Sequence, residues 1–523
     1  MHHERLAGRA CILLVLIGCA SRGDLPRAGG VAPSPVAAPA PATNAGGDDP
    51  TSDLAITFHP GVTGHVGWAK LPKPLPLYFL GEPGALIIRA DGDGRDPSQD
   101  ELFAGQLARA ALADTSIEVN ERSLCSPMLL DAVGRARPSR LLISIEGGLT
   151  PRGAACLAAL PVERIYFTGC LYRSHRRDDT CDGDAELATI LSVEPLRARV
   201  RGLAVSLSRG DSVKALAKLP ELELLAIVSG RKAQDGAHFH ALPFADLSHV
   251  RYLDITNWLG EVTVVHEALP FIAQLHTLRW SGARFAGQKL PACALRRVSA
   301  ERLNDDELQA LAPCADLREL SSDQADISSA ESLARWTRLQ RLHLRHLRVR
   351  DLAPLAKLTN LELLSLPASK AQEFRFVAAL TNLREVDLSQ TELADVSIVA
   401  RLTRLESLEV GFTGVRDLSP LRRLATLVVL DAHATNVVDV APLAGLTALA
   451  KLSLSHTEVT DLSPLARHPA LAWVILYGSR VTDASALLTM PRLRRAHIGG
   501  LKLPPDQVSA LRQRLGNQLD GAS

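Results

Sequence analysis

The chain has 523 residues and nearly balanced charge, with 58 basic against 57 acidic side chains and a formal net charge of +1 at pH 7. This balance gives no general attraction to nucleic acid or to an anionic surface, so neither is a favoured partner. Aromatic residues make up only 4% of a chain that is 46% hydrophobic, which indicates a core built mainly from aliphatic side chains.

Residues 1–18 have the pattern of an export signal. Arg5 and Arg9 supply positive charge, and the apolar run at 10–18 is shorter than the roughly 20 residues that span a bilayer. The run ends in Leu-Ile-Gly-Cys-Ala, which resembles the lipobox of bacterial lipoproteins. The resemblance implies that Cys19 carries the lipid and, because Ala20 follows it, that the protein is sorted to the outer membrane. A cleaved secretory signal with an incidental cysteine is the alternative.

The next two segments connect this signal to the folded part. Residues 19–53 are rich in proline, alanine and glycine, which predicts a disordered tether. Residues 54–124 are interpreted as an N-terminal cap, with a strand at 84–90 and a helix at 97–114. The acidic segment 91–101 lacks the glycine and carboxylate offsets of a calcium loop, so no metal is expected there.

Short strand-like segments recur between residues 125 and 336 at irregular intervals. Amphipathic helix patterns accompany several of them, which predicts a more helical outer side here than in the next segment. The strand-like segments read LLISI, VERIYF, VRGLAV, LELLAIV, VRYLDI, LHTLRW, LRRVSA and LRELSS.

Residues 337–490 divide into seven consecutive blocks of 22 residues, each with apolar residues in the pattern L-x-x-L-x-L. This period resembles bacterial leucine-rich repeats of the internalin-like class. The resemblance implies an α/β leucine-rich repeat solenoid with a parallel concave sheet of about sixteen strands and a convex side of short helices and turns. A terminal repeat and a helical cap are expected over 491–523.

Two polar positions also recur with this period, and structural roles are expected for both. Threonine stands where such families often carry asparagine, and its hydroxyl can bond the backbone as the chain leaves the strand. Aspartate precedes each convex turn and is expected to cap it rather than to form a catalytic or metal site. The threonines are Thr391, Thr413, Thr435 and Thr457, and the aspartates are Asp351, Asp395, Asp417, Asp439, Asp461 and Asp483.

The concave face is the expected binding surface, because alternate strand residues point onto it. Asp387, Glu409 and Asp431 form one column there, and a cationic ligand would relieve their repulsion. Trp473, Ile475 and Tyr477 place apolar surface on one strand, which is typical of a binding hot spot. Solvated carboxylates and cover by the C-terminal cap are the alternatives. The candidate ligand-binding residues are Glu385, Asp387, Glu409, Asp431, His433, Trp473, Ile475 and Tyr477.

Six cysteines follow the signal, and an exported protein can oxidise them. Cys170 and Cys181 flank a polar insertion, and Cys293 and Cys314 lie one repeat apart, each ahead of a predicted strand. The two remaining cysteines form a third pair by elimination. Six free buried thiols are the alternative. The candidate pairs are Cys170 with Cys181, Cys293 with Cys314, and Cys125 with Cys156.

The sequence carries no G-x-S-x-G, H-E-x-x-H or P-loop motif, and His238 and His240 lack a third metal ligand. No catalytic residue, cofactor or metal is therefore predicted. The resemblance implies a non-enzymatic envelope lipoprotein for adhesion or scaffolding, held on the membrane by its N-terminal lipid, whose concave face binds a protein partner. Recognition of a cell-wall or surface glycan by the same face is the alternative.

Overall fold

The computed structural model describes residues 87–89, 116–136, 140–146, 148–169, 182–229, 242–256, 262–281 and 283–521. All of them lie in Phe58–Ser523, the second of two compact units into which the chain divides. The predicted signal peptide and tether, with Cys19, lie outside the described residues. The same holds for Cys170, Cys181, His238 and His240.

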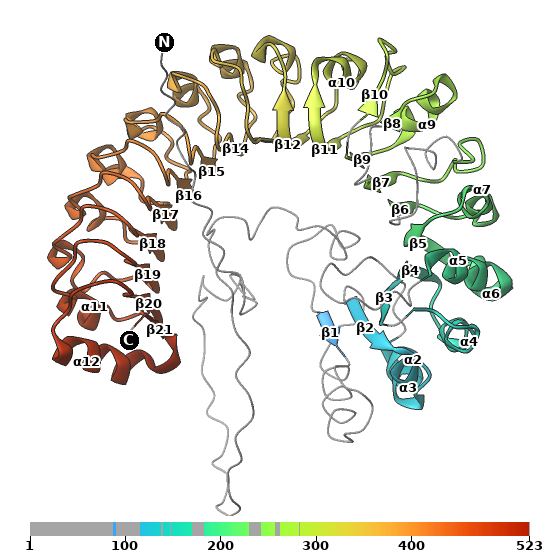
Figure 1. The fold of residues 1–523 in the computed structure, drawn as a ribbon, viewed down its shortest axis with the longest axis horizontal. Coiled ribbons are helices and arrows are strands. Elements are labelled where there is room, and N and C mark those ends of the chain that lie inside the picture. The colour runs from blue at the N-terminus through green and yellow to red at the C-terminus, as the bar shows by residue number, and fades with distance from the viewer. Residues whose placement is uncertain are drawn as a thin grey trace, which may run out of the picture. The chain divides into compact units, whose positions relative to one another are not determined.

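The described strands form a parallel sheet of nineteen strands in which each strand pairs with the strand of the next repeat (Figure 1). Apart from β1, the first ten strands are longer than most of those that follow. They are β1 (Ile87–Arg89), β2 (Ser116–Asn120), β3 (Arg140–Glu146), β4 (Arg164–Thr168), β5 (Val200–Leu207), β6 (Leu224–Ser229), β7 (Tyr252–Thr256), β9 (Thr277–Trp280), β11 (Arg297–Asn304) and β12 (Glu319–Asp326). The short strands β8 (Val262–Thr263) and β10 (Ala283–Arg284) form a separate pair.

The regular part of the sheet repeats with the period of the sequence. From β13 to β20 each strand begins 22 residues after the one before, so equivalent residues of successive repeats lie side by side in register. These strands are β13 (Arg341–Leu344), β14 (Leu363–Ser365), β15 (Glu385–Asp387), β16 (Ser407–Glu409), β17 (Val429–Asp431), β18 (Lys451–Ser453), β19 (Trp473–Ile475) and β20 (Arg495–His497). The last strand, β21 (Leu519–Asp520), pairs with β20.

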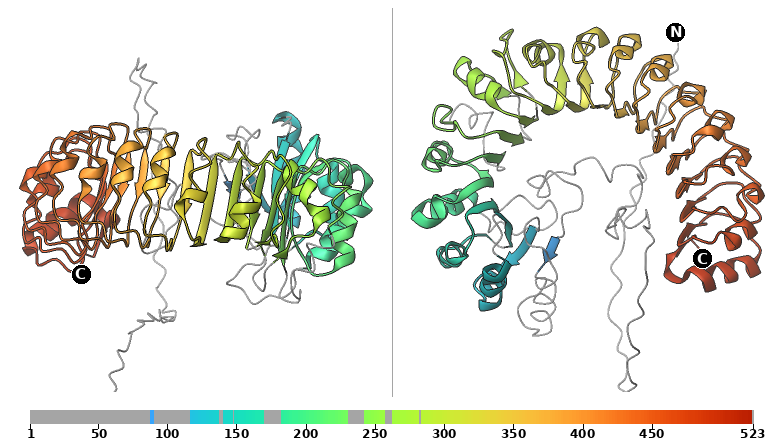
Figure 2. Two further views of the ribbon diagram at one scale, coloured as in Figure 1. Left: turned by 90° about the horizontal axis from the view of Figure 1, so that it is seen from above. Right: turned by 180° about the vertical axis from the view of Figure 1, so that it is seen from behind.

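Within this unit the strands line the inner side of the curve, and helices and turns lie on the outer side (Figures 1 and 2). The outer side carries α-helices, and all of them except α11 lie outside residues 337–490. They are α2 (Glu121–Leu124), α3 (Pro127–Ala136), α4 (Pro151–Ala159), α5 (Gly183–Ser192), α6 (Glu194–Arg197), α7 (Gly210–Ala215), α9 (Leu269–Gln274), α10 (Asp305–Ala310), α11 (Ser485–Thr489) and α12 (Pro505–Leu515).

Inside residues 337–490 the outer side has a short 3-10 helix in each of the first six repeats and the five-residue α-helix α11 in the seventh, so it is less helical than the irregular part, as predicted. Each predicted aspartate accepts a hydrogen bond from the backbone N–H two residues later at 2.7–2.9 Å, as a cap does. The turns are η7 (Ala353–Lys357), η8 (Arg375–Ala379), η9 (Val396–Val399), η10 (Ser419–Arg423), η11 (Ala441–Leu443) and η12 (Ser463–Leu465).

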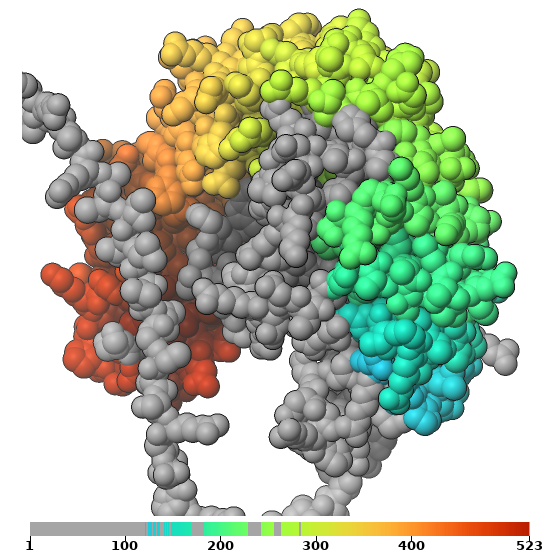
Figure 3. Space-filling view, turned by 45° about the vertical axis from the view of Figure 1, so that its right-hand side comes forward, coloured from blue at the N-terminus to red at the C-terminus, as the bar shows by residue number. Residues whose placement is uncertain are grey.

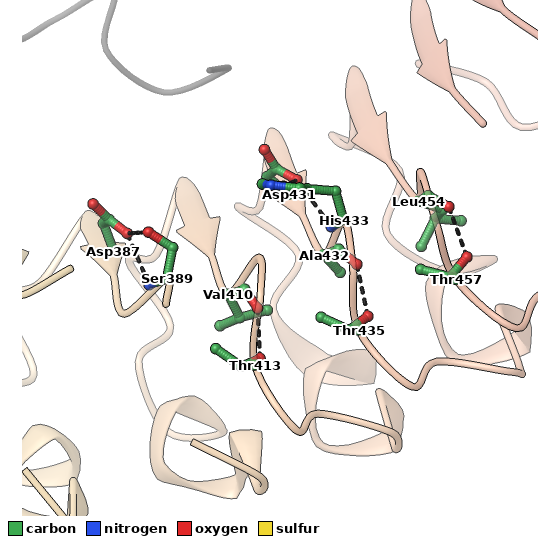
Figure 4. A network of polar contacts seen from close by, with 10 residues as sticks. All are labelled: Asp387, Ser389, Val410, Thr413, Asp431, Ala432, His433, Thr435, Leu454 and Thr457. Atoms are coloured by element: carbon green, nitrogen blue, oxygen red, sulfur yellow. Dashed lines mark hydrogen bonds and ion pairs between the residues drawn. The ribbon is translucent and has the colours of Figure 1, made fainter. Parts of the chain in front are cut away.

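A continuous column of buried leucine, isoleucine and valine fills the space between the sheet and the outer turns. In the space-filling view, successive repeats follow one another in sequence order (Figure 3). The threonine hydroxyls donate to the carbonyl oxygen three residues earlier, as in Thr413 Oγ1 to Val410 O at 2.5 Å and Thr435 Oγ1 to Ala432 O at 2.6 Å (Figure 4). The predicted backbone role of these threonines is therefore confirmed.

All sixteen predicted strands are present, and the sheet has three more. The strand predicted at 84–90 within the N-terminal cap is present as β1, and β1 and the unpredicted β2 join the main sheet through β3. At the other end, β21 follows the predicted helix α12. Strand pairing therefore extends beyond the recognisable leucine pattern in both directions.

Candidate functional site

The three acidic residues predicted to share a column do so. Asp387 pairs in register with Glu409, and Glu409 with Asp431, across β15, β16 and β17. Adjacent strands are about 4.8 Å apart, so the central carboxyl lies between two others at close range. Asp431, which was expected on the exposed face, is only 3% exposed, whereas Asp387 and Glu409 are partly buried. We call Asp387, Glu409 and Asp431 the acidic column.

Hydrogen bonds hold Asp387 at one end of the column. Ser365 Oγ donates to Asp387 Oδ2 at 2.8 Å, and His343 Nδ1 lies 2.8 Å from the same hydroxyl. The backbone N–H and the hydroxyl of Ser389 donate to Asp387 Oδ1 at 3.0 and 2.6 Å (Figure 4). Burial lowers the pKa of His343 below its ordinary value, which favours the neutral imidazole.

At the other end, His433 holds Asp431. The backbone N–H of His433 donates to Asp431 Oδ1 at 3.0 Å, and its Nδ1 lies 2.7 Å from that oxygen (Figure 4). The hydrogen bond to Asp431 raises the pKa of His433 above its ordinary value, against the effect of burial. Both outer carboxylates therefore have fixed partners within the sheet.

Glu409 differs from its two neighbours. Within the described part of the chain, no hydrogen bond or ion pair to its carboxyl group is found. Burial, together with the charges of Asp387 and Asp431, raises the pKa of Glu409 to about 9. Glu409 is therefore protonated at pH 7. This proton relieves the repulsion within the acidic column, a role for which the sequence had suggested a cationic ligand.

Next to the acidic column lies an aromatic residue between two cations. Trp473 pairs in register with Lys451 on β18 and with Arg495 on β20. Lys451 Nζ lies 4.1 Å from the Trp473 ring centroid, and Arg495 Cζ lies 5.1 Å from it. Burial lowers the pKa of Lys451 to about 8. Because β18 and β20 flank β19, the strands on both sides contribute to covering the indole.

Two exposed aromatic side chains stand just beyond the strand ends. Tyr477 is 44% exposed, with the imidazoles of His456 and His497 at centroid distances of 5.1 and 5.2 Å. Phe412 is 53% exposed, and the His433 ring meets it edge-on at 4.7 Å. Tyr477 was among the predicted residues, and Phe412 was not.

Phe412 occupies a position whose backbone is left-handed in every regular repeat. Its φ is 55°, and equivalent residues in the other repeats have φ between 52° and 76°. Those equivalents are His346, Ala368, Gln390, Ala434, His456, Gly478 and Gly500. Phe412 is the one phenylalanine in this series, and aligning the repeats on this position is the signal that could have revealed it.

A depression of about 370 Å³ opens beside the Phe412 ring. Three successive repeats line it, and its walls combine the phenylalanine with amide, hydroxyl and charged groups. The lining residues are Ser369, Lys370, Gln390, Thr391, Glu392 and Phe412.

The remaining predicted residues have structural partners. Glu385 lies 3.9 Å from Arg341, and Ile475 is partly buried in register with Ser453 and His497. Disulfides join Cys125 to Cys156 and Cys293 to Cys314. Over the residues that the structure describes, no group of three or more His, Cys, Asp or Glu side chains is placed to hold a metal ion. In that same part, no helix combines the length and hydrophobicity needed to cross a bilayer.

No protein-family model and no curated protein matches the chain. Among solved structures, it is similar to an internalin of Listeria monocytogenes, with 18% identity over 61% of this chain and 91% of that chain and a TM-score of 0.41. It is similar to a leucine-rich repeat protein of Leptospira interrogans, with 15% identity over 64% of this chain and 98% of that chain and a TM-score of 0.48. It is also similar to the ectodomain of an Arabidopsis thaliana receptor kinase, with 13% identity over 78% of this chain and 58% of that chain and a TM-score of 0.42. On its own repeat register and its buried column of leucines, the chain is an α/β leucine-rich repeat solenoid.

Proposed function

We propose that this chain is a non-enzymatic envelope lipoprotein that binds a protein partner through the concave face of its solenoid. The observation that carries the proposal is the composition of that face between β15 and β20. It combines Trp473, Arg495 and the exposed Tyr477, which are residue types enriched at protein interfaces, with an acidic column that a partner of complementary charge can match. Adhesion or scaffolding on the cell envelope would follow from such binding.

The export signal and the lipobox pattern around Cys19 support the location. Lipidation contributes about 0.8 kcal/mol per buried methylene, so two or three acyl chains would anchor the protein durably. The proline-rich residues 19–53 would then separate the solenoid from the membrane.

Glycan recognition by the same face is the alternative, and the surroundings of Trp473 favour a protein. Sugars stack on an open aromatic face, but Lys451 and Arg495 lie over this ring at 4.1 and 5.1 Å. A partner carboxylate can approach the two cations without displacing them from the ring.

The experiment is affinity capture with the purified mature chain, offered envelope proteins in one arm and isolated cell-wall and surface glycans in the other. Tyr477→Ala removes an exposed concave side chain, and Val438→Ala, at another exposed apolar residue, is the matched control. We expect a protein to be captured by the wild type and by Val438→Ala, and captured less by Tyr477→Ala. Capture of glycan alone, or equal capture by all three chains, would overturn the proposal.

A further inference from the structure

Phe412 is exposed to solvent rather than part of the core. It is the most exposed of the large hydrophobic side chains in the described part of the chain, at 53%. Its positive φ is imposed by the repeat, and a left-handed backbone costs an ordinary residue on the order of 1 kcal/mol. The smaller residues at the equivalent positions show that the fold does not need a phenyl ring there. The ring is therefore a local feature of this repeat, placed where it contacts solvent.

One side of the Phe412 ring packs against His433, which Asp431 of the acidic column holds in place. Asp431 Oδ1 holds the His433 imidazole at 2.7 Å, and that imidazole meets the Phe412 ring edge-on at 4.7 Å. Gly411 leaves the space that the imidazole needs, since a Cβ at this position would lie 2.3–3.0 Å from His433 ring atoms. One side of the phenyl ring is thereby packed, and another side lines the depression.

The depression has the size of a side-chain pocket. Its volume of about 370 Å³ is at the low end of the roughly 300–1,000 Å³ found for small-molecule sites. The phenyl ring of Phe412 is its one apolar wall, and the other five lining residues are polar or charged. A pocket of this kind suits one side chain of a larger partner that packs an apolar group against the phenyl ring.

The distance from the pocket to the acidic column matches an extended chain. Phe412 follows Glu409, the last residue of β16, by three residues, and because the chain turns between them their Cα atoms are at most about 10 Å apart. An extended segment of a partner covers this distance within about three residues. Asp387 and Asp431 of the acidic column attract positive charge although Glu409 between them is protonated, so the residue that reaches the column should be basic.

We propose that Phe412 and its depression receive an apolar side chain of an extended partner segment, while a lysine or arginine about three residues away lies over Asp387, Glu409 and Asp431. This inference rests on the proposed function, because it names the part of the partner that the concave face recognises. A cation over the column would favour ionised Glu409, so binding would release a proton.

The test uses a displayed library of random decapeptides, selected on the full mature chain. We expect selected peptides to share a basic and an apolar residue about three positions apart. Phe412→Ala should weaken their binding about tenfold and remove the apolar preference. The double variant Asp387→Asn with Glu409→Gln should remove the basic preference, and Val438→Ala should change neither. Selection of peptides without this pairing, selection of acidic peptides or no selection at all would overturn the inference.

A second measurement separates this inference from the proposed function. Any envelope protein captured by the wild-type chain is titrated against Phe412→Ala and Tyr477→Ala. If Tyr477→Ala weakens binding and Phe412→Ala does not, the concave face binds protein but the Phe412 pocket is not its docking element. A roughly tenfold loss with Phe412→Ala supports the inference on the natural partner. Concentration-dependent self-association lost in Phe412→Ala would instead assign the pocket to a second copy of this chain and overturn it.

Discussion

Replacing Glu409 by glutamine should stabilise the solenoid, and the gain should grow with pH. In the folded protein the pKa of Glu409 is raised from 4.5 to about 9. Between these values the folded chain keeps a proton that the unfolded chain has lost. The free energy of unfolding therefore falls as the pH rises through this window, by at most about 1.4 kcal/mol per pH unit. Glutamine does not titrate, so Glu409→Gln removes this loss.

The magnitude follows from the spacing of the strands. Two unit charges about 4.8 Å apart repel by roughly 0.9 kcal/mol with the screening of bulk water, and by about 3.5 kcal/mol at an effective dielectric constant near 20. Glu409 has one such neighbour on each side. Because its side chain is partly exposed to solvent, we take the lower part of that range and expect a gain of about 2–3 kcal/mol at pH 8 and well under 1 kcal/mol at pH 5.

The assay is urea unfolding followed by circular dichroism at pH 5 and pH 8. Glu406→Gln is the matched control, since Glu406 lies in the same repeat but pairs with Arg384 at 2.5 Å and should gain nothing at either pH. Equal stability of Glu409→Gln and the wild type at pH 8, or the same gain at both pH values, would refute the account of a carboxyl held protonated by its neighbours.

Three further predictions concern the scaffold and its anchor. Thr413→Val keeps the shape of a buried side chain but removes the hydroxyl that donates to the carbonyl oxygen of Val410. It should lower the free energy of unfolding, measured in urea, by about 0.5–1.5 kcal/mol. An unchanged unfolding midpoint would contradict the role of that hydrogen bond. Replacing Cys293 and Cys314 by serine opens a bond that joins residues 21 positions apart, and should lower the free energy of unfolding by roughly 2–4 kcal/mol. If reductant lowers the free energy of unfolding of that double variant as much as that of the wild type, the Cys293–Cys314 disulfide is not the source of the stabilisation. Cys19→Ser should move the protein from the membrane to the soluble fraction in cell fractionation, and retention on the membrane would show that the anchor lies elsewhere.

The 22-residue period predicted the sheet because every repeat places its leucines at the same offsets. Leucines such as Leu408 and Leu430 occupy the same offset, and stacking is the only way for a single repeat to bury them. The ends of the sheet lack that signal. β2 has no leucine pattern and β21 is two residues long, so backbone pairing with a neighbour, rather than a pattern of their own, makes them strands.

The sequence predicted which residues of the binding face share a column, but not which of them are protonated or how far each is exposed. The register of Asp387, Glu409 and Asp431 follows from counting 22, whereas the proton on Glu409 depends on how deeply the column is buried. Phe412 was missed because periodicity identifies residues that face the core, and this ring faces solvent at a backbone conformation that the sequence does not mark. Its packing against His433 depends on the glycine at 411, which only the three-dimensional arrangement explains.

Site-specific photo-crosslinking tests most directly whether the concave face is the binding surface. A photoreactive amino acid is placed at Ile475 on the concave strand β19 and, in a second chain, at the exposed Val438 between β17 and the turn η11. Both chains are incubated with envelope extract, and the adducts are identified by mass spectrometry with and without excess unmodified protein. The account predicts one protein species attached at 475, displaced by the excess, and no such species at 438. The same adducts at both positions, or specific adducts at 438 alone, would contradict it.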